Sequence, residues 1–83
     1  MYTRYITYDL NYADADDYDE LSELINSYHG RMITESTYQI DSFDDWDTFK
    51  NKFLRATKPG DRIKAIVLTK NGTKRKMEVW TIR

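Results

Sequence analysis

The chain has 83 residues, enough for one domain, and a domain of this size buries only about 60% of the surface that its unfolded chain exposes. It contains no cysteine, which excludes disulfide bonds, thiolate catalysis and cysteine-based zinc sites and is typical of a reducing compartment. The chain shows no signal-peptide pattern and no apolar run of membrane length, so we expect a soluble, cytoplasmic protein without a membrane partner.

Charge is distributed unevenly along the chain. Residues 1–49 contain two basic and twelve acidic side chains, and residues 50–83 contain eleven basic and two acidic side chains. The halves therefore carry −10 and +9, although the whole chain carries −1. This asymmetry indicates either a face that attracts an anion such as nucleic acid, or two halves that complement each other within the fold or between subunits.

Residues 3–10 alternate in character and are rich in Tyr, Thr and Ile, which predicts a β-strand. Ile6, Tyr8 and Leu10 would face the core, and Asp9 at the end of the strand would face away from it. A helix follows, with apolar residues at helical spacing. These residues are Tyr18, Leu21, Leu24, Ile25 and Tyr28.

The ends of this first helix carry their own signals. Asp17 as N-cap with Glu20 three residues later predicts the start, and Gly30 predicts the end. The acidic run from Asp14 to Glu20 fits stabilisation of a helix N-terminus better than a calcium loop. His29 fits the C-terminal end of the helix better than the role of a general base.

Residues 31–40 return to alternating, β-rich composition, which predicts a second strand over this whole segment. Ser42 is expected to cap a second helix with an aromatic stripe of Trp46, Phe49 and Phe53, and Lys58-Pro59-Gly60 to end it. A third strand from Arg62 to Thr69 would then be joined to a fourth, Met77 to Ile82. The pair Asn71-Gly72 predicts a type I′ turn between these strands.

This order of elements, β-α-β-α-β-β, predicts one domain over residues 1–83 with a C-terminal hairpin. Right-handed crossovers would place both helices on the same face of the sheet, so we expect a two-layer, ferredoxin-like α+β sandwich. The opposite face of the sheet would be bare and would include Tyr5, Thr7 and Asp9. Such a face, in a domain with a small core, favours a homodimer.

Several segments resemble the CRISPR-associated Cas two family over nearly the whole chain. They are the first strand ending in Tyr8-Asp9-Leu10-Asn11, a helix of about four turns, the segment Glu35-Ser36-Thr37-Tyr38-Gln39-Ile40, an amphipathic helix, and Gly60-Asp61-Arg62-Ile63 before a strand. The chain looks even more like the stand-alone, SinR-like relatives of that family. It is also similar in outline to the virulence-associated D-type ribonucleases. Order and spacing, more than any single motif, carry the resemblance.

The resemblance implies a symmetric dimer of ferredoxin-like subunits with a catalytic role for Asp9. The Asp9 residues of two subunits would face each other across the dimer axis and hold one Mg²⁺ or Mn²⁺ ion, whose bound water could attack a phosphodiester. Asn11 could add an oxygen ligand or contact a phosphate, and Tyr8 or Tyr12 could stack on a base. Many members of the family bind nucleic acid without such catalysis. The residue pattern also allows a second interpretation, in which Asp9 simply begins a turn.

Basic residues flank the expected C-terminal turn and could neutralise phosphates of RNA or DNA. These are Lys70, Lys74, Arg75 and Lys76. The alternative is that they only protect an edge strand from aggregation.

Two functions therefore stay open. The chain could be a homodimeric nucleic-acid-binding protein with metal-dependent endoribonuclease or other nuclease activity. It could instead be a non-catalytic module that binds a protein partner through its acidic N-terminal half, as an adaptor or a small inhibitor encoded by a mobile element.

Overall fold

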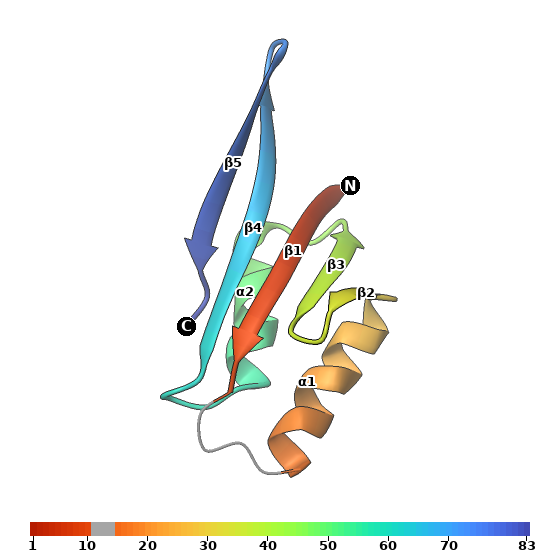
Figure 1. Cartoon of the computed structure of the whole chain (residues 1–83), viewed down its shortest axis with the longest axis vertical. Coiled ribbons are helices and arrows are strands. Elements are labelled where there is room, and N and C mark those ends of the chain that lie inside the picture. The colour runs from red at the N-terminus through yellow and green to blue at the C-terminus, as the bar shows by residue number, and fades with distance from the viewer. Residues whose placement is uncertain (11–14) are drawn as a thin grey trace.

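In the computed structural model, a five-stranded antiparallel sheet is covered on one face by two helices (Figure 1). The structure describes residues 1–10 and 15–83, and only the backbone of residues 15–17, 70 and 71. The elements are β1 (Tyr2–Asp9), α1 (Ala15–Ser27), β2 (Arg31–Thr34), β3 (Thr37–Ser42), α2 (Trp46–Arg55), β4 (Arg62–Asn71) and β5 (Lys74–Thr81). The strand order is β2-β3-β1-β4-β5. The prediction of a small α+β domain with two layers is confirmed.

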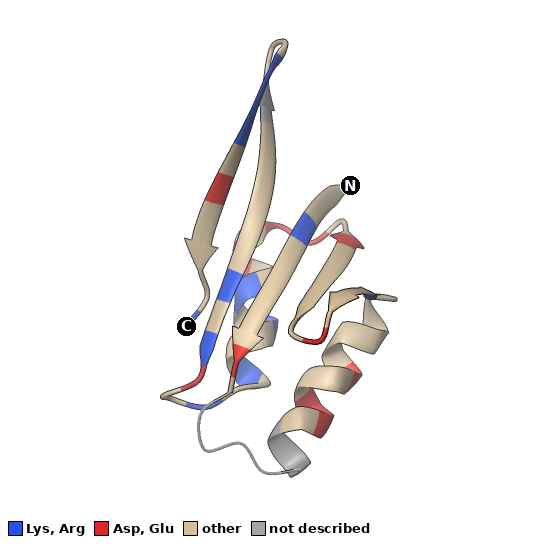
Figure 2. Cartoon of the chain, in the orientation of Figure 1, with Lys and Arg blue, Asp and Glu red and all other residues tan. Residues whose placement is uncertain are grey.

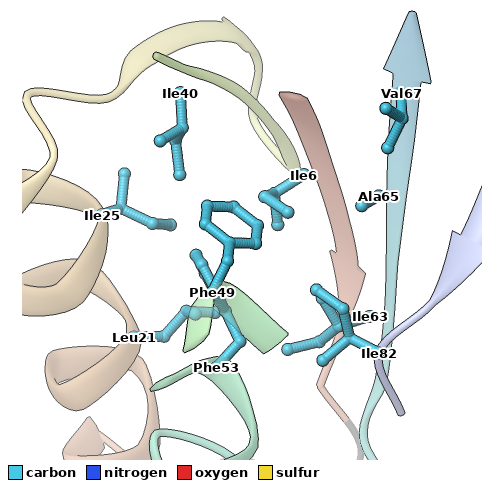
Figure 3. Close-up of a cluster of buried hydrophobic side chains, with 10 residues drawn as sticks. All are labelled: Ile6, Leu21, Ile25, Ile40, Phe49, Phe53, Ile63, Ala65, Val67 and Ile82. Atoms are coloured by element: carbon cyan, nitrogen blue, oxygen red, sulfur yellow. The ribbon is translucent and has the colours of Figure 1, made fainter. Parts of the chain in front are cut away.

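The hydrophobic core lies between the sheet and the two helices (Figure 3). On β1 the alternation is as predicted, because Ile6 is fully buried while Tyr8 and Leu10 pack against the core from the same face. Antiparallel pairing brings core residues of β4 opposite those of β1. The buried apolar residues are Ile6, Leu21, Ile25, Ile40, Phe49, Phe53, Ile63, Ala65, Val67 and Ile82.

The prediction of one strand over residues 31–40 is wrong, because the chain reverses at Glu35-Ser36 to form a β2–β3 hairpin. The strand alternation continues through the turn, so the pattern contains no sign of the reversal. The turn also lacks the Gly, Asn or Pro that usually marks one. Instead, the hydroxyl of Thr34 accepts a hydrogen bond of 3.4 Å from the Ser36 N–H. The element order is therefore β-α-β-β-α-β-β.

Helix α1 begins at Ala15, so Asp17 lies within its first turn and is not the N-cap that the sequence predicts. Backbone hydrogen bonds close its C-terminal end. The Gly30 N–H donates to the Ile25 carbonyl at 3.0 Å, and the His29 N–H donates to the Asn26 carbonyl at 2.9 Å. This is a Schellman motif in which His29 takes the left-handed conformation, with φ of 55°.

Gly30 is needed at this helix end because of close packing. A Cβ atom on Gly30 would lie 2.5 Å from Cγ2 of Ile25 and 3.1 Å from the Ile25 carbonyl oxygen. The predicted stop signal is therefore real, but the left-handed residue is its neighbour, His29.

The N-cap of α2 is Asp45, whose carboxylate accepts a hydrogen bond of 2.8 Å from the Thr48 N–H. The prediction of Ser42 as the cap is wrong. Ser42 is the last residue of β3 and is buried opposite Tyr2 of β1. The aromatic stripe is placed as predicted, with Phe49 and Phe53 fully buried.

The β4–β5 hairpin extends past the start of β1 and past both helices, which makes the molecule elongated, with dimensions of 44 × 24 × 23 Å (Figure 1). Asn71 pairs with Lys74, so the two turn residues are Gly72 and Thr73. Gly72 has φ of 64° at the first turn position, which fits a type II′ turn. The hairpin is as predicted, but its turn is displaced by one residue and differs from the predicted type I′.

Candidate nucleic-acid interface

Asp9 lies exposed at the end of β1, on the sheet face away from the helices, as the alternation predicts. It pairs with Arg62 of β4, and two residues earlier Thr7 pairs with Lys64. These side chains, with Tyr8, line one shallow depression of about 200 Å³. Asp9 is thus surrounded by two basic side chains that the sequence did not connect with it.

The surroundings of Asp9 within one chain do not fit a divalent cation. Mg²⁺ prefers several oxygen ligands and is repelled by cations. In the depression, however, one carboxylate accompanies Arg62 and Lys64. Among the described residues, no group of three or more His, Cys, Asp or Glu side chains is arranged to hold a metal. A second carboxylate would have to come from a second copy of the chain.

The other residues that the resemblance suggested for this region are Asn11 and Tyr12. Both lie outside the described residues.

The predicted basic cluster lies at the projecting end of the β4–β5 hairpin (Figure 2). Lys74, Arg75 and Lys76 are all exposed, and they follow one another in β5. Because side chains alternate along a strand, Lys74 and Lys76 share the face that the helices cover farther down, and Arg75 lies on the open face. The fourth predicted residue, Lys70, pairs with Arg75, and its side chain is not among those described.

Lys76 is the first member of a row of polar contacts along β5. Its Nζ lies 3.3 Å from the carboxylate of Glu78, which also accepts a hydrogen bond of 2.9 Å from Trp80 Nε1. Both interactions lower the pKa of Glu78, the bond from Trp80 most strongly. These contacts hold Trp80 in place. Lys74 and Arg75 lie beyond them, at the tip of the hairpin.

The open face of the sheet carries an apolar band between its basic ends. Ladder pairs in the middle of this face join Tyr5 to Ile66, Ile66 to Val79, and Leu68 to Met77. Leu68, Met77 and Val79 are each at least half exposed. The face combines apolar side chains with Arg62 and Lys64 at one end and Arg75 at the other.

A buried arginine is the site residue that sequence reasoning missed. Arg4 is only 3% exposed, and its guanidinium donates to the Asp44 carbonyl at 2.9 Å. Burial lowers its pKa, and the nearby Tyr2 and Asp44 oppose this effect. The strand alternation indicates this burial, because Arg4 lies two residues before Ile6 and therefore shares the core face of β1.

Asp44, which lies between β3 and α2, connects Arg4 of β1 to Tyr28 at the end of α1 and to Lys52 of α2. Its carboxylate accepts hydrogen bonds of 2.6 Å from the Tyr28 hydroxyl and 2.9 Å from Lys52 Nζ. These bonds lower the pKa of Asp44, whereas burial and the bond to Asp44 raise that of Tyr28.

Comparison of the chain with protein-family models, curated proteins and solved structures gives no match. In the part of the chain that the structure describes, neither helix is long and apolar enough to cross a membrane.

Proposed function

We propose that this chain is a nucleic-acid-binding protein that acts as a homodimer of ferredoxin-like subunits. The observation that carries the proposal is the row of exposed cations Lys74, Arg75 and Lys76 at the end of a hairpin that projects from the domain. The ferredoxin-like classification is supported by the order β2-β3-β1-β4, to which β5 adds an edge strand.

The hairpin has the shape and charge that suit a polyanion. Its cations lie on both faces of a two-stranded ribbon, so phosphates could be contacted from either side. Each phosphate neutralised in this way releases condensed counterions, which makes the binding strong at low salt and weak at high salt. The acidic side chains that the structure describes in residues 1–49 do not lie at this tip, which favours a positive local potential there (Figure 2).

The homodimer is supported by the open face of the sheet. Leu68, Met77 and Val79 expose apolar surface there that no helix covers, and an 83-residue domain has a small core of its own. A second copy of the same face would cover this band by two-fold symmetry.

Salt-dependent binding tests the proposal. Labelled RNA and DNA are titrated with the wild-type protein at increasing salt, and with a variant carrying Lys74→Ala, Arg75→Ala and Lys76→Ala. We expect the salt slope to fall by about 1 for each cation that contacts a phosphate. The matched control is Arg31→Ala, Lys50→Ala and Arg55→Ala, which removes the same charge elsewhere and should retain wild-type binding. Absence of binding at low salt would reject the proposed function.

Metal-dependent cleavage, which the family resemblance implies, would need two copies of Asp9. We propose that any nuclease activity belongs to the dimer, since one chain offers a carboxylate between two cations. The assay measures cleavage with Mg²⁺, with Mn²⁺ and with chelator. Cleavage that is lost in Asp9→Asn and in a monomeric variant supports this assignment. Binding with no cleavage would leave a nucleic-acid-binding protein without catalysis.

Exposed acidic residues on α1 favour a second candidate function, that of a protein-binding module. Asp19, Glu20 and Glu23 are exposed on this helix, far from the hairpin tip (Figure 2). An acidic helix of this kind suits a partner protein with a basic surface. This alternative would be favoured if the chain binds no nucleic acid but does bind a protein partner, and if Glu20→Lys and Glu23→Lys abolish that binding.

A further inference from the structure

A cleft of about 430 Å³ opens beside the projecting hairpin, on the face of the sheet that carries the helices. Tyr2 and Arg4 of β1, Trp46 at the start of α2, Val67 and Thr69 of β4, and Trp80 of β5 contribute to its lining. Its volume lies within the range of about 300–1,000 Å³ that small-molecule sites occupy. Beside this cleft the hairpin continues past the helix layer (Figure 1).

Aromatic rings dominate this cleft, and their positions are held by neighbouring groups. Trp46 and Trp80 meet edge to face, with centroids 4.8 Å apart and an interplanar angle of 79°. The indole N–H of Trp80 is already bonded to Glu78. The two rings are thus held in fixed positions. They offer a ligand mainly apolar surface for contact.

Tyr2 differs from the two tryptophans because it is 53% exposed. Its ring lies against the buried guanidinium of Arg4, with Arg4 Cζ 4.7 Å from the ring centroid. This cation–π contact orients the ring and leaves much of it accessible at the cleft. Tyr2 is therefore the lining residue best placed to stack on an incoming planar group.

Asp45 also lines the cleft, and positive charge lies farther along the same face of the hairpin, beyond Glu78. Thr69 lines the cleft and pairs directly with Lys76, to whose carbonyl its hydroxyl donates at 3.2 Å. Paired residues in antiparallel strands share a face, so Lys76 lies beside the cleft, and Lys74 follows on the same face. A ligand with an aromatic group in the cleft and anionic groups along its chain would match this arrangement.

We propose that the cleft takes the unpaired base of a single-stranded nucleic acid, with flanking phosphates on Lys74 and Lys76. The inference rests on the proposed nucleic-acid-binding function and adds a preference for single strands. Stacking on aromatic side chains accepts any base, because every base has a π face. A duplex keeps its bases paired and stacked, so it could use the cations but not the cleft.

Tyr2→Ala tests the inference, with Phe43→Ala as its control. Phe43 is an aromatic residue of the neighbouring loop that is 78% exposed and does not contribute to the cleft. Binding is measured to a labelled single strand, to an abasic strand of the same length and charge, and to a duplex. We expect Tyr2→Ala to weaken binding of the base-bearing strand roughly 5- to 100-fold and to leave the abasic strand unaffected. Phe43→Ala and Tyr2→Phe should bind like the wild type.

Tryptophan fluorescence provides a second measurement that does not depend on a variant. Trp46 and Trp80 are the two tryptophans of the chain, and both line the cleft, so a stacked base should quench their emission. Equal binding of base-bearing and abasic strands, with no quenching, would overturn the inference while leaving salt-dependent nucleic-acid binding intact. Absence of all binding would reject both the inference and the function on which it rests.

Discussion

The guanidinium of Arg4 lies 4.6 Å from the ring centroid of Phe49, inside the hydrophobic core. The ring of Tyr2 lies 4.7 Å from the same group. The guanidinium also bonds to the backbone of Asp44, and its Nε is a buried side-chain atom without a hydrogen-bond partner. A charge in such a position costs desolvation energy, which these contacts offset only in part.

Replacing Arg4 by Met should change the free energy of unfolding by less than about 1 kcal/mol. Buried charges are often replaced by apolar residues of similar size without loss of stability, and Met fills much of the same volume. Arg4→Ala should instead cost about 2–4 kcal/mol, because it leaves a cavity beside Phe49. Urea unfolding followed by circular dichroism measures both. If Met costs as much as Ala, the charge itself, and not the volume, stabilises the core.

Asp44→Asn should lower the free energy of unfolding by about 1–3 kcal/mol at neutral pH, because a carboxylate with two hydrogen bonds is removed. The pKa of Asp44 is lower in the folded state than its ordinary value of 3.8. Its contribution is therefore present above pH 3.8 and is lost as the pH falls below that value. Unfolding curves at several pH values should show the variant and the wild type converging in acid. A difference that persists at low pH would assign the effect to packing.

The control for this experiment is Asp47→Asn, which changes another carboxylate in the first turn of α2. Asp47 is exposed, so its substitution should cost less than about 1 kcal/mol.

Neighbouring residues at the end of α1 should respond in opposite directions. His29→Gly should stabilise the protein by about 0.5–1 kcal/mol, because the left-handed φ of 55° strains a residue with a Cβ atom. Gly30→Ala should destabilise it by about 1–3 kcal/mol, because the new methyl group would overlap Ile25. Thermal unfolding of both variants compares them. A stabilised Gly30→Ala would show that Ile25 can move away at little cost.

Met77→Glu should shift the proposed dimer to a monomer. Met77 lies on the apolar band of the open sheet face, and a carboxylate there would be buried against its symmetry mate. Sedimentation velocity measures the change. Phe43→Glu, at a comparably exposed apolar residue away from this face, should leave the proposed dimer intact. Monomeric wild-type protein, or a Met77→Glu variant that still dimerises, would exclude this face as the interface.

Local patterns predicted most of the secondary structure. Leu21 and Ile25 repeat at helical spacing, as do Phe49 and Phe53, and all four are buried on the core side of their helices. The secondary-structure predictions were wrong where a turn carried no sequence signal, and where a residue typical of an N-cap served another role. The Glu35-Ser36 turn interrupts neither the alternation nor the composition of its strand. Ser42 has the chemistry of an N-cap, but it pairs with Tyr2 in the sheet, and Asp45 caps the helix instead.

The sequence by itself determined which face of β1 and of each helix packs into the core and where the cations lie along the chain, because side-chain periodicity and charge are local properties. Only the tertiary structure decided which distant residues meet. The antiparallel register of β1 and β4 places Asp9 beside Arg62, and the same sheet brings Tyr2 and Trp80 to one cleft. Such contacts depend on strand order and register, which arise from packing of the whole sheet against its helices and which no single segment encodes.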